Sequence, residues 1–96
     1  MTTMVRAEMT VESAQGIHLA PANLIAETAD KFASQIHFKT EYMDLNAKSI
    51  INLVGGTLRK GDKVLCVCNG PDEKEALEAM RELLSQDLDA LLEDKS

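Results

Sequence analysis

The apolar residues of this 96-residue chain switch between two spacings, and this switch is the strongest constraint on its fold. Residues 5–11 alternate between apolar and polar side chains, which is the period of a half-buried strand. Residues 35–41 and 63–68 repeat that pattern. Residues 20–33 and 72–91 instead place apolar side chains every three or four positions, as amphipathic helices do. The chain therefore predicts an α+β fold.

The connecting segments predict the order of these elements. A turn precedes a short returning strand over 45–48, and Ser49 can cap a short helix that ends at a Gly-Gly pair. Asp72 and Glu75 resemble a capping box at the start of the last helix. The expected order is β-α-β-β-α-β-α in a single domain over residues 1–96. Three helices should cover one face of a four-stranded, mostly antiparallel sheet, forming an open-faced β-sandwich.

The net charge of −6 is concentrated in the C-terminal part of the chain. Residues 1–70 carry seven acidic and seven basic residues, whereas residues 71–96 carry nine acidic and three basic residues. Since no basic face is visible, nucleic acid is not an expected partner. We expect the acidic segment 86–96 to be a solvated, fraying helix end, with an interaction tail as the alternative.

The strand over 63–68 carries two cysteines, Cys66 and Cys68, on one face. Neighbours this close in an extended chain rarely form a disulfide, so we expect reduced core thiols. Together with two distant histidines they lack the ligand spacing of a zinc site, and no metal or cofactor is expected. Leu65 and Val67 should face the uncovered side of the sheet, as a dimer contact, a domain contact or ordinary surface residues.

The N-terminal segment and the hydropathy of the chain predict a cytoplasmic protein without membrane insertion. Residues 1–12 carry three charged side chains and no sustained apolar run, unlike a signal peptide. No apolar stretch approaches the roughly 20 residues that a membrane span needs.

His18 lies directly before a helix start that Pro21 marks, because proline suits the first helical position. Unpaired N–H groups and the dipole at a helix N-terminus both favour an anion. Imidazole is also a nucleophile near neutral pH. The position therefore suits a phosphoryl acceptor, although a lone histidine before a helix is more often an ordinary surface or capping residue.

Three segments in register resemble the histidine-containing phosphocarrier protein (HPr) family. Residues 16–22 (Gly-Ile-His-Leu-Ala-Pro-Ala) resemble its active-site motif, and residues 47–51 (Ala-Lys-Ser-Ile-Ile) resemble its regulatory-serine segment. Residues 70–77 (Gly-Pro-Asp-Glu-Lys-Glu-Ala-Leu) resemble the start of its last helix. The 31-residue separation of His18 and Ser49 is the one usual in the family.

The resemblance implies a phosphocarrier of the bacterial phosphotransferase system, which serves sugar transport. His18 would accept a phosphoryl group from an enzyme I-like donor and pass it to a sugar-specific or regulatory acceptor. Ser49 would be the target of a regulatory serine kinase and phosphatase. The backbone groups that would hold the phosphoryl group belong to Leu19, Ala20, Ala22 and Asn23.

The active-site segment departs from the family pattern in two places. The family arginine two residues after the histidine is Ala20 here, and Leu19 replaces a small residue. A well-placed guanidinium contributes about 1.5–3 kcal/mol to holding an anion, so its loss would weaken transfer. The alternative to a carrier is a non-relay regulatory binding module, controlled through Ser49 or through surface contacts.

The expected partner surface also differs from the family pattern. The exposed side of the first helix carries Glu27 and Asp30 where the family often has lysines, which predicts a dedicated partner or a specialised regulatory branch. Ile50, Ile51 and Val54 beside the short helix are candidates for docking, with core burial as the alternative for some of them.

Overall fold

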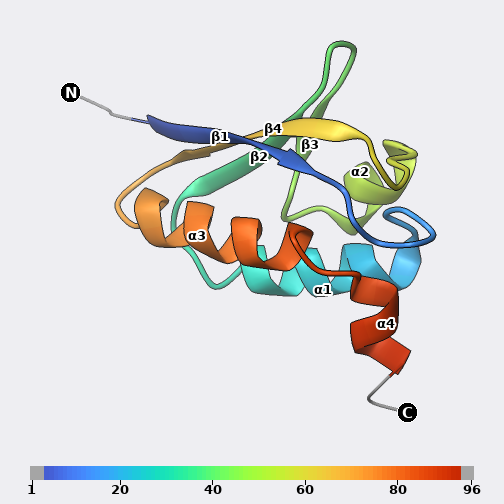
Figure 1. Ribbon diagram of the computed structural model, residues 1–96. Helices are drawn as coiled ribbons and strands as arrows, with labels where there is room; N and C mark the ends of the chain where they lie inside the picture. Colours follow the sequence, from blue (N-terminus) through green and yellow to red (C-terminus); the bar gives the residue numbers. More distant parts are fainter. Residues whose placement is uncertain (1–3, 94–96) are drawn as a thin grey trace.

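The computed structural model describes residues 4–93 and shows a four-stranded antiparallel sheet with α1 and α3 against one face (Figure 1). The strands β1 (Met4–Thr10), β2 (Gln35–Lys39), β3 (Asp44–Asn46) and β4 (Lys63–Asn69) lie in the order β1-β4-β2-β3. The helices are α1 (Leu19–Ala29), α2 (Ile50–Gly55), α3 (Glu73–Leu84) and α4 (Leu88–Glu93). The α+β open-faced sandwich is confirmed, but the expected three helices are four.

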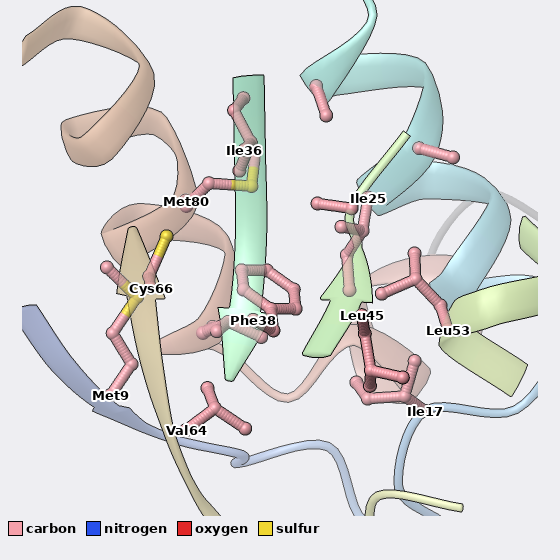
Figure 2. Packing of buried hydrophobic residues seen from close by; sticks show 14 of the residues in the cluster. Met9, Ile17, Ile25, Ile36, Phe38, Leu45, Leu53, Val64, Cys66 and Met80 are labelled. Carbon is pink, nitrogen blue, oxygen red and sulfur yellow. The ribbon is translucent and has the colours of Figure 1, made fainter. Parts of the chain in front are cut away.

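The core lies between the sheet and the helices, and the two inner strands β4 and β2 contribute side chains to it (Figure 2). Val64, Cys66 and Cys68 of β4 point toward the helices and are almost fully buried, so the expected core thiols are confirmed as free, buried cysteines. Figure 2 shows Cys66 close to Met80 of α3 and Phe38 of β2. A core of aliphatic and sulfur side chains agrees with an aromatic content of only 3%.

Within residues 4–93, no helix lies over the opposite face of the sheet (Figure 1). Val67 of β4 pairs with Arg6 of β1 and His37 of β2, so Val67 and Leu65 lie on the uncovered face as the alternation predicts. His37 also contacts Asp44 of β3 through Nδ1 at 2.7 Å. Polar neighbours thus surround the apolar side chains on this face.

The observed bounds of α1 are Leu19–Ala29 rather than the expected 20–33. After the helix, the N–H groups of Lys31 and Phe32 donate to carbonyls three residues earlier, which tightens the chain into turns. Pro21 is the third helical residue instead of the first, and the missing N–H costs nothing because the first turn has no intrahelical acceptor for it. The apolar spacing continued through the turns and therefore overestimated the length of the helix.

The expected helix over 72–91 is wrong, because the chain breaks it into α3 and α4. The side chains of Ser85 and Gln86 donate to a carbonyl in the last turn of α3. The Asp87 carboxylate then accepts two amides of α4, at 3.1 and 3.4 Å, as an N-cap residue does. Leu84 and Leu88 keep helical spacing across the break, and this spacing hid it.

The acidic C-terminal segment packs against the fold, so the expectation of a fraying end is wrong for α4 (Figure 1). Leu88 is fully buried, and its N–H donates to the hydroxyl of buried Ser13 at 3.1 Å. Leu91 is half-buried against the core. Residues 94–96 lie outside the described part of the chain.

Asp72 does not form the expected capping box with Glu75. Its carboxylate accepts the hydroxyl of Ser34 at 2.5 Å and the amides of Ala33 and Ser34 at 2.9 Å. The Ser34 hydroxyl and these amides hold the pKa of Asp72 below its usual value. The residue therefore ties the loop after α1 to the start of α3.

We predict that Leu88→Ala lowers the free energy of unfolding by about 3 kcal/mol, because it removes a fully buried side chain that joins α4 to the core. Urea unfolding measures this change. The matched control is Leu19→Ala, since Leu19 is 66% exposed and its truncation should cost about 0.5 kcal/mol or less. Equal losses in the two variants would contradict the packing of α4.

Candidate functional site

His18 is the N-cap residue of α1, with φ −88° and ψ −167°, and its side chain makes no capping hydrogen bond. The side chain is 43% exposed. The next two amides, of Leu19 and Ala20, have no acceptor within residues 4–93. A solvent-accessible imidazole thus lies at the positive end of an 11-residue helix with two unpaired donors beside it.

Only part of the expected set of anion-binding amides remains unpaired. The Ala22 amide donates to the His18 carbonyl at 2.9 Å, and Pro21 has no N–H to offer. Asn23 is the fifth residue of α1, where a regular helix pairs the amide with the carbonyl four residues earlier. The amides that stay available in the described structure are those of Leu19 and Ala20.

The loop before His18 is held by backbone contacts that need a glycine. The Ile17 N–H donates to the Leu58 carbonyl at 2.9 Å, and the Gly16 N–H donates to the Ser13 carbonyl at 2.9 Å. Gly16 has φ +73°, which other residues rarely adopt. A Cβ on Gly16 would also overlap the carbonyl oxygen of Leu58. Gly16 therefore allows the close approach that places His18.

Asp89 of α4 is the direct partner of the His18 ring. Its Oδ1 lies 2.6 Å from Nε2 of His18, and its Oδ2 accepts the Gln15 N–H at 3.0 Å. Burial raises the pKa of Asp89, but the Gln15 amide and the His18 ring outweigh it and hold the pKa below the usual value. The carboxylate is therefore an anion at neutral pH.

Sequence reasoning missed Asp89, because 71 positions separate it from His18. One local signal for a separate short helix was present. Asp87 is a residue type that caps helix starts, and the apolar Leu88 follows it directly. Nothing in a single sequence shows where such a helix packs.

His18 also borders a shallow hollow on the surface. Val54 of α2 lines it, together with Leu58 and Arg59 of the segment that follows α2. Among the described residues that line this hollow, Arg59 is the only basic one besides His18. Arg59 therefore adds a cation near the candidate site, although the residue two positions after His18 is Ala20.

The family described as "PTS HPr component phosphorylation site" matches residues 5–86. The chain belongs to the HPr family. The match includes His18 and ends before α4 begins.

Individual relatives agree with this assignment to the HPr family. Phosphocarrier protein HPr of Lysinibacillus sphaericus is 37% identical over 79 residues, which cover 82% of this chain and 90% of the relative. HPr-like protein Crh of Halalkalibacterium halodurans is 32% identical over 77 residues, covering 80% and 92%. The crystal structure of HPr from Bacillus anthracis has a TM-score of 0.81 at 28% identity, covering 85% of this chain and 98% of that one. HPr proteins are phosphocarriers of the bacterial phosphotransferase system, which serves sugar transport.

The candidate docking residues of this HPr-family protein are mostly exposed. Ile51 is 83% exposed and Val54 is 38% exposed, whereas Ile50 is half-buried against the core. Glu27 and Asp30 are exposed on α1. Val54 alone of these five lines the hollow beside His18.

Ser49 lies at the start of the short helix α2, as the sequence predicts. It is the N-cap of α2, and its hydroxyl oxygen accepts the Asn52 N–H at 3.2 Å. The residue is half-buried and does not line the hollow beside His18. The predicted capping role is confirmed, whereas its role as a phosphorylation site stays a prediction.

Side chains that could bind metal lie apart from one another. His37 contacts Asp44 on the uncovered face of the sheet, whereas Cys66 and Cys68 are inside the core. Across residues 4–93, no group of three or more His, Cys, Asp or Glu side chains could hold an ion. In the same part of the chain, no helix has both the length and the apolar character to cross a bilayer.

We predict that Gly16→Ala lowers the free energy of unfolding by more than about 2 kcal/mol, because it adds a backbone clash to an unfavourable φ. Gly61→Ala is the matched control, since Gly61 has φ +92° with open space around it and should cost about 1 kcal/mol. Chemical denaturation measures both values. Equal losses would mean that the Leu58 carbonyl does not restrict residue 16.

Proposed function

We propose that the protein is a phosphoryl carrier in which His18 accepts a phosphoryl group from an enzyme I-like donor. The group then passes to a sugar-specific or regulatory acceptor of the phosphotransferase system. The observation that carries this proposal is the exposed His18 imidazole at the N-terminus of α1, beside the unpaired amides of Leu19 and Ala20.

Elementary chemistry supports this role. A neutral imidazole nitrogen supplies the lone pair that attacks phosphorus, and the transferred group brings negative charge. Unpaired N–H donors and the helix dipole favour that charge next to His18. Arg59, which lines the same hollow as His18, adds a positive charge to this surface. The protein would act as a relay substrate of its partners rather than as an enzyme with turnover.

Exposed apolar side chains near His18 support a protein partner. Leu19 is 66% exposed at the start of α1, and Val54 lines the hollow together with His18. Such a surface suits contact with another protein more than a small molecule, because the hollow is shallow and open. The HPr family implies proteins of the phosphotransferase system as partners.

The decisive experiment is incubation with phosphoenolpyruvate and a cognate enzyme I, followed by intact mass measurement. We expect an acid-labile adduct with the mass of one phosphoryl group, because phosphoryl groups on imidazole nitrogen hydrolyse in acid. His18→Ala should abolish the adduct, while His37→Ala should leave it, since His37 lies on the uncovered face of the sheet. Absence of an adduct on the unmodified protein would reject the carrier role.

We predict that Glu27→Lys with Asp30→Lys speeds phosphorylation by an enzyme I whose docking surface is acidic. The two exposed carboxylates of α1 repel such a surface, and charge complementarity mainly changes the association rate, here by about tenfold or more at low salt. Stopped reactions over a range of salt concentrations measure the rate.

The control for this prediction is Glu41→Lys with Glu75→Lys, which changes the net charge equally at exposed positions outside α1. It should have a smaller effect. Equal acceleration by both pairs, or a fast reaction of the unmodified protein with that enzyme I, would reject a specialised docking surface.

A regulatory module controlled through Ser49 is the second candidate function. The Ser49 hydroxyl lies at the N-cap of α2, where a phosphate would add negative charge to the start of a helix. A relative named HPr-like protein Crh is compatible with this alternative. An acid-stable adduct that needs ATP, a serine kinase and Ser49, without any adduct on His18, would favour the module over the carrier.

A further inference from the structure

We propose that Asp89 is a positioning residue that occupies Nε2 of His18 and thereby directs phosphoryl transfer to Nδ1. The proposal rests on the proposed role of His18 as acceptor and adds a residue from α4. That helix begins at Leu88, beyond the segment over 5–86 that matches the HPr family. The carboxylate is therefore supplied from outside the matched part of the chain.

The hydrogen bond fixes which ring nitrogen can react. Oδ1 of Asp89 lies 2.6 Å from Nε2, and an ionised carboxylate can only accept a hydrogen bond. Nε2 therefore carries the proton, and in the neutral ring Nδ1 keeps the free lone pair. Asp89 thus sets both the tautomer and the orientation of the His18 imidazole.

The carboxylate is itself held in place. Its second oxygen, Oδ2, accepts the Gln15 N–H at 3.0 Å, and the Asp89 side chain is only 16% exposed. An exposed ion pair is usually weak, because two mobile side chains must be ordered. Here the backbone of the loop before His18 orders one partner, which makes the contact with the ring more persistent.

α4 has further contacts with the same loop that do not involve His18. The Leu88 N–H donates to Ser13 Oγ at 3.1 Å, and the Asp87 carboxylate accepts the Ala14 N–H at 3.1 Å. With Leu88 fully buried, these contacts place α4 against residues 13–15. The position of Asp89 relative to His18 therefore follows from packing, and Asp87 offers a matched residue that touches the loop but not the ring.

Phosphoryl transfer to His18 forms one P–N bond and breaks another. The Nδ1 lone pair of His18 forms a bond to phosphorus of the donor's phosphohistidine, while the donor's P–N bond breaks and its electron pair returns to the donor nitrogen. Nε2 keeps its proton, so the His18 ring gains a positive charge opposite the Asp89 carboxylate. Arg59 lines the same hollow as His18.

A chemical donor tests the choice of nitrogen without any protein partner. Potassium phosphoramidate transfers a phosphoryl group to imidazole nitrogen and releases ammonia. With ¹⁵N-labelled protein, phosphorus–nitrogen coupling in NMR spectra identifies the modified ring nitrogen of His18. The variants are Asp89→Ala, which removes the acceptor, and Asp87→Asn, which removes a nearby charge but keeps a capping side chain.

We expect the wild-type protein and Asp87→Asn to carry the group on Nδ1. In Asp89→Ala the ratio of Nδ1 to Nε2 adduct should fall by about tenfold or more, as loss of a charge-assisted hydrogen bond implies. A wild-type adduct on Nε2, or an unchanged ratio in Asp89→Ala, would overturn the proposal. Unchanged amide signals of Ala14, whose N–H donates to Asp87, and of strand β4 verify that the variant is folded, whereas the Gln15 signal should shift because its acceptor is gone.

A second arm uses enzyme I and phosphoenolpyruvate to separate this proposal from the carrier role. Asp89→Asn should slow formation of the phosphoprotein about tenfold relative to Asp87→Asn. Equal rates together with an unchanged adduct ratio would reject Asp89 while the carrier role stands. No phosphorylation of the wild-type protein by enzyme I would reject the carrier role, even if the chemical donor shows that Asp89 selects Nδ1.

Discussion

The position of the His18 ring depends on a short loop that is fixed from two sides. On one side the Ile17 N–H bonds to the Leu58 carbonyl, at a distance that only Gly16 permits. On the other side α4 covers the loop, with Leu88 buried in the core and Asp89 on the ring. The candidate site therefore requires chain segments that lie some 40 and 70 residues away from it.

Much of the fold could be predicted from local patterns. Strands alternate because one face of the sheet is buried, so Val64, Cys66 and Cys68 identified both β4 and its inward face. Ser49 identified the start of α2 through the chemistry of its hydroxyl. The position of His18 before a helix was likewise visible, because a proline in the first turn marks a helix start.

The rest depended on contacts between distant residues. Asp72 had the local pattern of a capping box, but Ser34 offered a hydroxyl and an amide from another loop, and this tertiary contact replaced the cap. Apolar spacing ran unbroken through residues 72–91, so only the hydrogen bonds of Asp87 revealed two helices. The pairing of His18 with Asp89 also depends on a contact between distant residues. It could not be predicted, because the acidic character of residues 86–96 indicated a solvated end of the chain.

The two cysteines of β4 have a consequence for how the sheet can be studied. Their sulfur atoms lie 3.9 Å apart inside the core, where the hydrogen bond with Cys68 and burial raise the pKa of the Cys66 thiol. Both side chains point toward the helices and are fully buried, so an alkylating reagent reaches these sulfurs only when the helices separate from the sheet. The rate of alkylation in the native protein thus reports how often the core between helices and sheet opens, without any introduced label.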